Sequence, residues 1–154
     1  MAKHLLWVDD EWPLLERLVA RLKEQSVDTD CAESVAEGRL MMQGHDYDGF
    51  LIDMILPASS SPGQESDPSI WDRRPFLGLD LLEDIWALER KARPAVVVLT
   101  IAEDDRLLER LTRLKRKGVV DEILRKGVLR FEEVTHTVVC ALGVACGQEG
   151  LGRA

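Results

Sequence analysis

The chain has 154 residues, a length that suits a single domain. Hydrophobic residues make up 45% and charged residues 31%, a globular balance that excludes a chain disordered throughout. The 28 acidic and 20 basic residues give a net charge of −8. Nucleic acid is therefore not an expected partner, since its binding depends on neutralising phosphates.

The sequence lacks the signals of a membrane or secreted protein. No apolar run approaches the roughly 18 residues of a membrane-spanning helix, and the first apolar run meets Asp9 too early for a signal peptide. The three cysteines, Cys31, Cys140 and Cys146, include no Cys-x-x-Cys pair, which argues against a disulfide framework or structural zinc. We expect a cytoplasmic protein with free thiols and no membrane contact.

Short apolar runs rich in β-branched residues alternate with longer amphipathic runs. The first pattern predicts buried strands and the second predicts helices. The predicted strands cover residues 5–8, 27–32, 50–56, 95–100 and 119–124. The predicted helices cover residues 13–25, 34–44, 79–88, 104–117 and 131–146.

Capping residues mark two of these helices. Ser34 and Glu37 form a capping box, Asp104 or Asp105 can begin the fourth helix, and Gly118 stands just past its end. Trp7 and Trp86 fall on apolar faces of predicted elements, so both are expected in the core.

Strict alternation of five strands and five helices predicts an α/β fold with a parallel sheet and helices on both faces. In such sheets ligands gather at the carboxyl ends of the strands. Five residues with useful chemistry lie at those ends, and we expect their side chains to converge. They are Asp9 and Asp10 after the first strand, Asp53 in the third, Thr100 ending the fourth and Lys126 past the fifth.

These side chains have complementary chemistry. At an effective dielectric constant of about 20, two carboxylates about 4 Å apart repel by about 4 kcal/mol. A divalent cation removes that cost, and an all-oxygen ligand set suits Mg²⁺. Asp53 is then free to attack a phosphoryl group, whose oxygens Lys126 can neutralise and the Thr100 hydroxyl can bind.

Four stretches, in this order, resemble those of a response-regulator receiver domain of two-component signalling. They are Leu6 to Glu11, Phe50 to Pro57, the run ending in Thr100, and Ile123 to Gly127. The resemblance extends to about Cys146. It implies a flavodoxin-like, doubly wound, five-stranded parallel sheet in the order 2-1-3-4-5 with five helices.

The resemblance also implies a function and a site. A histidine kinase or phosphotransfer protein would phosphorylate Asp53, with contacts from Thr100 and Lys126, and an unknown downstream protein would receive the signal. The domain would catalyse only its own phosphorylation and dephosphorylation, as a monomer or weak homodimer. The implied Mg²⁺ ligands are Asp9, Asp10, Asp53 and the backbone carbonyl of Ile55.

The chain departs from the family pattern after the third strand. Pro57 matches the family's proline. The family's third helix opens with a glycine about eight residues after the phosphorylated aspartate, whereas the matching Gly78 lies 25 residues after Asp53, which implies an insertion of roughly 17 residues. We expect a receiver domain over residues 1–146, an inserted loop over 57–77 and a flexible tail over 147–154. The loop leaves the strand beside Asp53, so one hypothesis is that it acts as a lid.

Two alternatives remain open. A receiver-like scaffold that is never phosphorylated would use the long loop for docking, and Ile101 and Gly127, which replace the family's usual small residue and proline, favour it. An aspartate-nucleophile phosphatase of the haloacid dehalogenase type is also Mg²⁺-dependent. That class has a second acid two residues after the nucleophile, where this chain has Ile55.

Overall fold

A computed structural model of the protein describes residues 2–11, 16–57, 76–88, 93–100, 104–126 and 130–144. Within these ranges, no helix combines the length and apolar character needed to cross a membrane. Several sequence predictions lie outside the described residues. They concern the helix start at Pro13, residues 58–75 of the inserted loop, Ile101, Gly127, Cys146 and the tail over 147–154.

Five strands form one sheet in the order β2-β1-β3-β4-β5, and every neighbouring pair is parallel. The strands are β1 (Lys3–Val8), β2 (Val27–Ala32), β3 (Gly49–Asp53), β4 (Ala95–Thr100) and β5 (Glu122–Arg125). The central strands are continuous apolar runs because both of their faces are buried. The predicted doubly wound α/β fold is confirmed.

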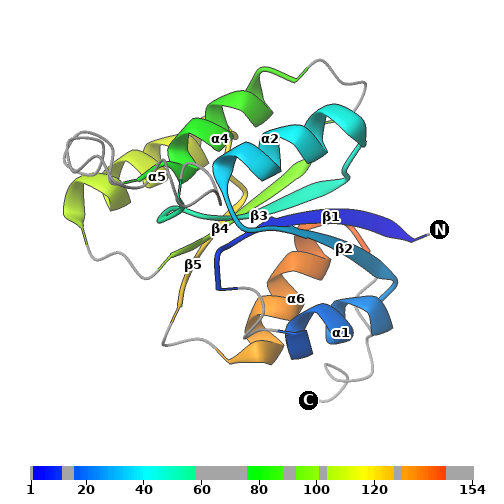
Figure 1. Ribbon diagram of the computed structural model, residues 1–154. Helices are drawn as coiled ribbons and strands as arrows, with labels where there is room; N and C mark the ends of the chain where they lie inside the picture. Colours follow the sequence, from blue (N-terminus) through cyan, green and yellow to red (C-terminus); the bar gives the residue numbers. More distant parts are fainter. Residues whose placement is uncertain are drawn as a thin grey trace.

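Helices cover both faces of the sheet (Figure 1). On one face lie α2 (Val35–Gly44), α4 (Gly78–Trp86) and α5 (Asp105–Lys117), and on the other lie α1 (Glu16–Glu24) and α6 (Phe131–Ala141). Alternate residues of β1 supply the two cores: Leu6 and Val8 pack with the first group of helices, Leu5 and Trp7 with the second.

The predicted capping residues take their expected positions. The Ser34 hydroxyl accepts a hydrogen bond from the Glu37 amide at 3.2 Å, which begins α2. The Asp104 carboxylate accepts one from the Leu107 amide at 2.9 Å, which begins α5. Gly118 closes α5 in the left-handed conformation, with φ of 84°.

Three elements end two or more residues earlier than predicted, and one of them, α4, stops at Trp86 rather than residue 88. β3 stops at Asp53 rather than Leu56, because the Asp53 carboxylate accepts a hydrogen bond from the Ile55 amide at 3.1 Å and so turns the chain. The final helix stops at Ala141 rather than residue 146, because Gly143 takes a φ of 72°, outside the right-handed helical region.

β5 begins at Glu122 rather than Val119. The amides of Val119 and Val120 donate to the Leu114 carbonyl at 2.9 and 3.3 Å, which ties both residues to the end of α5. Both valines are buried in the core beneath α4 and α5. Their apolar character therefore reflects burial in a connection rather than in a strand.

The two tryptophans expected in the core differ in exposure. Trp7 is 0% exposed, as predicted, whereas Trp86 is 58% exposed and its core prediction is wrong. The buried side of α4 is formed by Leu81, Leu82 and Ile85. Trp86 is the next residue after Ile85, about 100° further around the helix, which directs it away from the core.

Candidate functional site

The acidic residues meet at the carboxyl edge of the sheet between β1 and β3. Val8 and Ile52 are partners in the parallel register, so the residues that follow them, Asp9 and Asp53, lie side by side. In the sheet β1 has β2 as its neighbour on one side and β3 on the other, so the chain reverses its direction across the sheet after β2. This switch in strand order is where doubly wound sheets bind ligands.

Three carboxylates form a compact cluster at this edge. Asp9 is 0% exposed, Asp53 is 3% exposed and Asp10 is exposed. One carboxylate oxygen from each lies within 4.8 Å of the others. An all-oxygen set of this size, with one exposed member, fits a hard divalent cation such as Mg²⁺ that retains several waters. The predicted convergence of the three acids is confirmed.

Lys126 joins this cluster from the end of β5. Its Nζ lies 2.8 Å from Asp9 Oδ2 and 2.8 Å from Asp53 Oδ2. Its backbone amide donates to the Thr100 carbonyl at 2.9 Å, which fixes where the side chain starts. Side chains from positions 9, 53 and 126 thus form one buried network, as the sequence predicted.

The pKa of Asp53 reflects two opposing influences. The net pKa value is raised from 3.8 to about 6, chiefly by burial and further by the charge of Asp9. The hydrogen bond and charge of Lys126, with the Ile55 amide, oppose this rise. Asp53 is therefore mainly a carboxylate at neutral pH, yet its negative charge is poorly stabilised.

The neighbouring groups show the same crowding of charge. Burial raises the pKa of Asp10, and the charges of Asp9 and Glu11 raise it further. Burial lowers the pKa of Lys126, but hydrogen bonds and charges from Asp53 and Asp9 outweigh it and raise that pKa overall. The ammonium is held in its charged form, and the carboxylates still repel one another.

Two further predicted residues lie at the same edge. Thr100, the last residue of β4, is buried and follows Leu99, the register partner of Asp53. Ile55 donates its amide to Asp53, and its side chain is partly exposed. The phosphoryl contact of Thr100 and the metal contact of the Ile55 carbonyl remain predictions.

One contact of the site was not predicted. Glu11 Oε2 lies 3.5 Å from Lys126 Nζ, and the Glu11 amide donates to Asp9 Oδ1 at 2.9 Å. The available signal was a third consecutive acid after a buried strand. Glu11 adds a partly exposed negative charge beside the ammonium.

Gly78 fixes the start of α4 against the site. Its amide donates to the Met54 carbonyl at 3.0 Å. A Cβ at this position would overlap the Asp53 carbonyl oxygen and lie 2.6 Å from Met54 Cα, so no larger residue fits without a backbone shift. The helix expected to open at Gly78 does so.

No family model matches the sequence, and no curated protein matches it. Solved structures match over most or all of the chain. A CheY-like response regulator receiver domain protein from Methanospirillum hungatei is 18% identical with a TM-score of 0.68, covering 99% of this chain and 100% of its own.

Two other solved structures agree. A two-component response regulator from Clostridium difficile is 19% identical with a TM-score of 0.65, covering 92% of this chain and 96% of its own. The response regulator TrrA from Thermotoga maritima, in complex with Mg²⁺ and BeF, is 23% identical with a TM-score of 0.62, covering 90% of this chain and 98% of its own. The chain therefore has the fold of response-regulator receiver domains.

Proposed function

We propose that this chain is a phosphoacceptor domain of two-component signalling, a receiver spanning residues 1–146. It takes a phosphoryl group onto Asp53 from the phosphohistidine of a histidine kinase or phosphotransfer protein. The supporting observation is the buried network of Asp9, Asp53 and Lys126 at the switch point of a receiver fold. Structural support alone requires no such gathering of buried charge.

In the proposed reaction, an Asp53 carboxylate oxygen attacks the phosphorus atom. An O–P bond forms, the P–N bond to the donor imidazole breaks, and the imidazole leaves with the bonding electrons and takes up a proton. Lys126 Nζ, 2.8 Å from Asp53 Oδ2, is positioned to stabilise the negative phosphoryl oxygens. The Thr100 hydroxyl is proposed to donate a hydrogen bond to one of them.

Asp9, Asp10 and Asp53 would hold Mg²⁺, with the Ile55 carbonyl as a further proposed ligand. The bound metal would neutralise phosphoryl charge and orient the donor. The chain's own contribution is to hold the carboxylates together despite their repulsion, largely through Lys126. The fit of Mg²⁺ follows from the oxygen-only donors and their spacing.

Phosphorylation of Asp53 is proposed to change the population of two states of the α5–β5–α6 surface, which would contact a downstream protein. Lys126 connects the site to this surface. Its side chain contacts Asp53, and its backbone continues from β5. A change in the charge of Asp53 therefore acts directly on a residue at the edge of that surface.

The decisive experiment treats the protein with acetyl phosphate and Mg²⁺ and follows intact mass. We expect gain of one phosphoryl group, loss of labelling in Asp53→Asn and with EDTA, and normal labelling in Asp28→Asn, which alters a half-exposed aspartate far from the site. Persistent stoichiometric labelling of Asp53→Asn would refute the proposal. Steady turnover of a generic phosphate ester would indicate a phosphatase.

A further inference from the structure

An apolar groove lies on the helical face of the molecule between α4 and α5, and it consists of two adjoining hollows. The larger, of about 260 Å³, has Leu82, Leu114 and Val119 among its lining residues. The smaller hollow, of about 160 Å³, has Leu88 and Val96 among its lining residues. Trp86 and Val119 line both hollows, and the two together are called the Trp86 groove.

The groove lies on the side of α4 that faces α5, away from α2. α4 lies close along α2, where Arg39 Nε and Asp84 Oδ2 form an ion pair at 2.6 Å. In the described residues few positions of α4 approach α5. An ion pair of Arg110 with Glu83, at 3.6 Å, crosses the gap.

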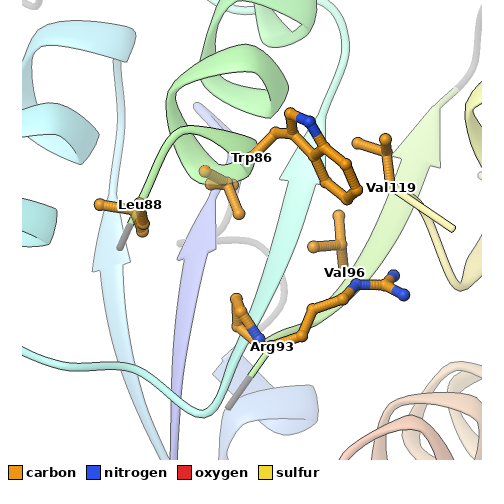
Figure 2. A pocket seen from close by; sticks show the side chains of 7 residues that line it. Trp86, Leu88, Arg93, Val96 and Val119 are labelled. Carbon is orange, nitrogen blue, oxygen red and sulfur yellow. The ribbon is translucent and has the colours of Figure 1, made fainter. Parts of the chain in front are cut away.

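Trp86 stands between the two hollows. In Figure 2 its ring extends from the end of α4 toward Val119, and the Arg93 side chain lies across the smaller hollow from it. With 58% of its surface exposed, the indole forgoes much of the stabilisation that burial of an aromatic ring provides. Tryptophan is one of the residue types enriched among the side chains that carry most of the binding energy of protein interfaces.

The division of the groove into two small hollows favours two separate side chains over one drug-sized molecule. Drug-sized ligands occupy pockets of about 300–1,000 Å³. A cavity of about 150 Å³ holds one benzene ring. Each hollow, at about 160 and 260 Å³, therefore suits one large apolar side chain. Two neighbouring side chains of one amphipathic segment would fill both.

The charges that line the groove select an acidic partner. Three are positive, Arg93, Arg110 and Lys117, and one is negative, Glu83. Glu83 is paired with Arg110, Arg93 is paired with Asp121 at 3.3 Å, and Lys117 forms no ion pair in the part of the chain that the structure describes. With both arginines paired, Lys117 is the rim cation available to a partner's acid, on a chain whose net charge is −8.

We propose that the Trp86 groove binds an acidic amphipathic segment of a partner protein. Two apolar side chains enter the hollows on either side of Trp86, and acidic side chains of the segment pair with Lys117 and Arg110. This binding uses the α4 side of α5 and does not depend on the function proposed for Asp53.

The test uses the full 154-residue chain and synthetic helical peptides of about 16 residues. One peptide carries leucines at positions i, i+4 and i+7 and acids elsewhere on its surface, and its matched control carries lysines in place of those acids. NMR of the ¹⁵N-labelled chain should show saturable shifts of the Trp86 indole N–H with the acidic peptide. The lysine peptide should bind at least about tenfold more weakly.

Variants separate groove binding from general attraction. Trp86→Ser and Lys117→Glu should each weaken acidic-peptide binding about tenfold. Two matched controls should leave it unchanged: Leu40→Ser alters an exposed leucine on α2, and Arg106→Glu alters an exposed cation of α5 that does not line the groove.

Three outcomes would overturn the proposal. The first is absence of saturable binding by the acidic peptide up to about 1 mM. The second is binding that Leu40→Ser or Arg106→Glu weakens as much as Trp86→Ser does. The third is concentration-dependent self-association in sedimentation that Trp86→Ser abolishes, which would assign the groove to a second copy of the chain.

Discussion

The cluster of Asp9, Asp10, Asp53 and Lys126, called here the carboxyl-edge site, is largely buried and charged. The Trp86 groove, by contrast, is open and apolar, with charges only along its rim. At the site, Asp9 and Asp53 have almost no exposed surface, and both depend on Lys126. In the groove, Trp86 is largely exposed, and the ion pairs at the rim are solvated. A substitution at the site should therefore disturb stability and chemistry together, while one in the groove should disturb binding alone.

Among substitutions in the site and the groove, the largest effect on stability is expected for Lys126→Met in the metal-free protein. The change leaves two buried carboxylates without their cation, so we expect the free energy of unfolding to fall by about 3 kcal/mol. Lys115→Met is the matched control, since Lys115 pairs with Glu122 at the surface and should cost less than about 1 kcal/mol.

Urea denaturation of the Lys126→Met variant at neutral pH, with and without Mg²⁺, provides the measurement. If the metal replaces the missing positive charge, Mg²⁺ should stabilise this variant more than the unmodified chain. Equal losses for Lys126→Met and Lys115→Met would contradict the contrast between a buried site and a solvated rim.

The next largest loss of stability is expected for Gly78→Ala. The added Cβ meets the backbone of Asp53 and Met54, which cannot move without shifting β3 or α4. We expect a loss of about 2 kcal/mol in unfolding free energy and a slower reaction with acetyl phosphate. Gly44→Ala is the control, because a Cβ there meets nothing within 4 Å, and it should be neutral or slightly stabilising.

Binding of Mg²⁺ should depend on pH. The pKa of Asp53 is raised to about 6 and that of Asp10 is also raised, so protons compete with the metal as pH falls. Affinity should be highest above pH 7 and fall by about tenfold for each pH unit well below 6. Titration calorimetry at pH 5, 6 and 7.5 measures this, and an unchanged affinity over that range would contradict it.

The sequence predicted the site better than the groove, for a physical reason. Asp9 and Asp53 directly follow apolar strands, and parallel strands bring such ends to one edge whatever the details of packing. Lys126 is likewise placed by its strand. Only the exposed Glu11 was missed, since its contact depends on side-chain reach rather than on strand position.

The groove depends on quantities that periodicity does not contain. An amphipathic pattern identifies the buried side of α4. Successive residues of a helix point about 100° apart, so assigning Trp86 to that side by mistake for its neighbour Ile85 places an exposed side chain in the core. The pattern is also silent on the spacing of α4 and α5, which decides whether the space between them is filled. Periodicity also does not show where an element stops. β3 ends at a hydrogen bond to the Asp53 carboxylate, and α6 ends near Gly143, whose φ is positive.

The smallest effect on stability is expected for the groove itself. Trp86→Ser should lower the free energy of unfolding by less than about 1 kcal/mol, because much of the indole already contacts solvent. Trp7→Ala should cost about 3–5 kcal/mol, because it empties a fully buried site beneath α1 and α6. Thermal and urea denaturation of both variants measure the difference. Similar losses for the two would mean that Trp86 contributes to the core, and would remove the reason to regard its exposure as a feature of binding.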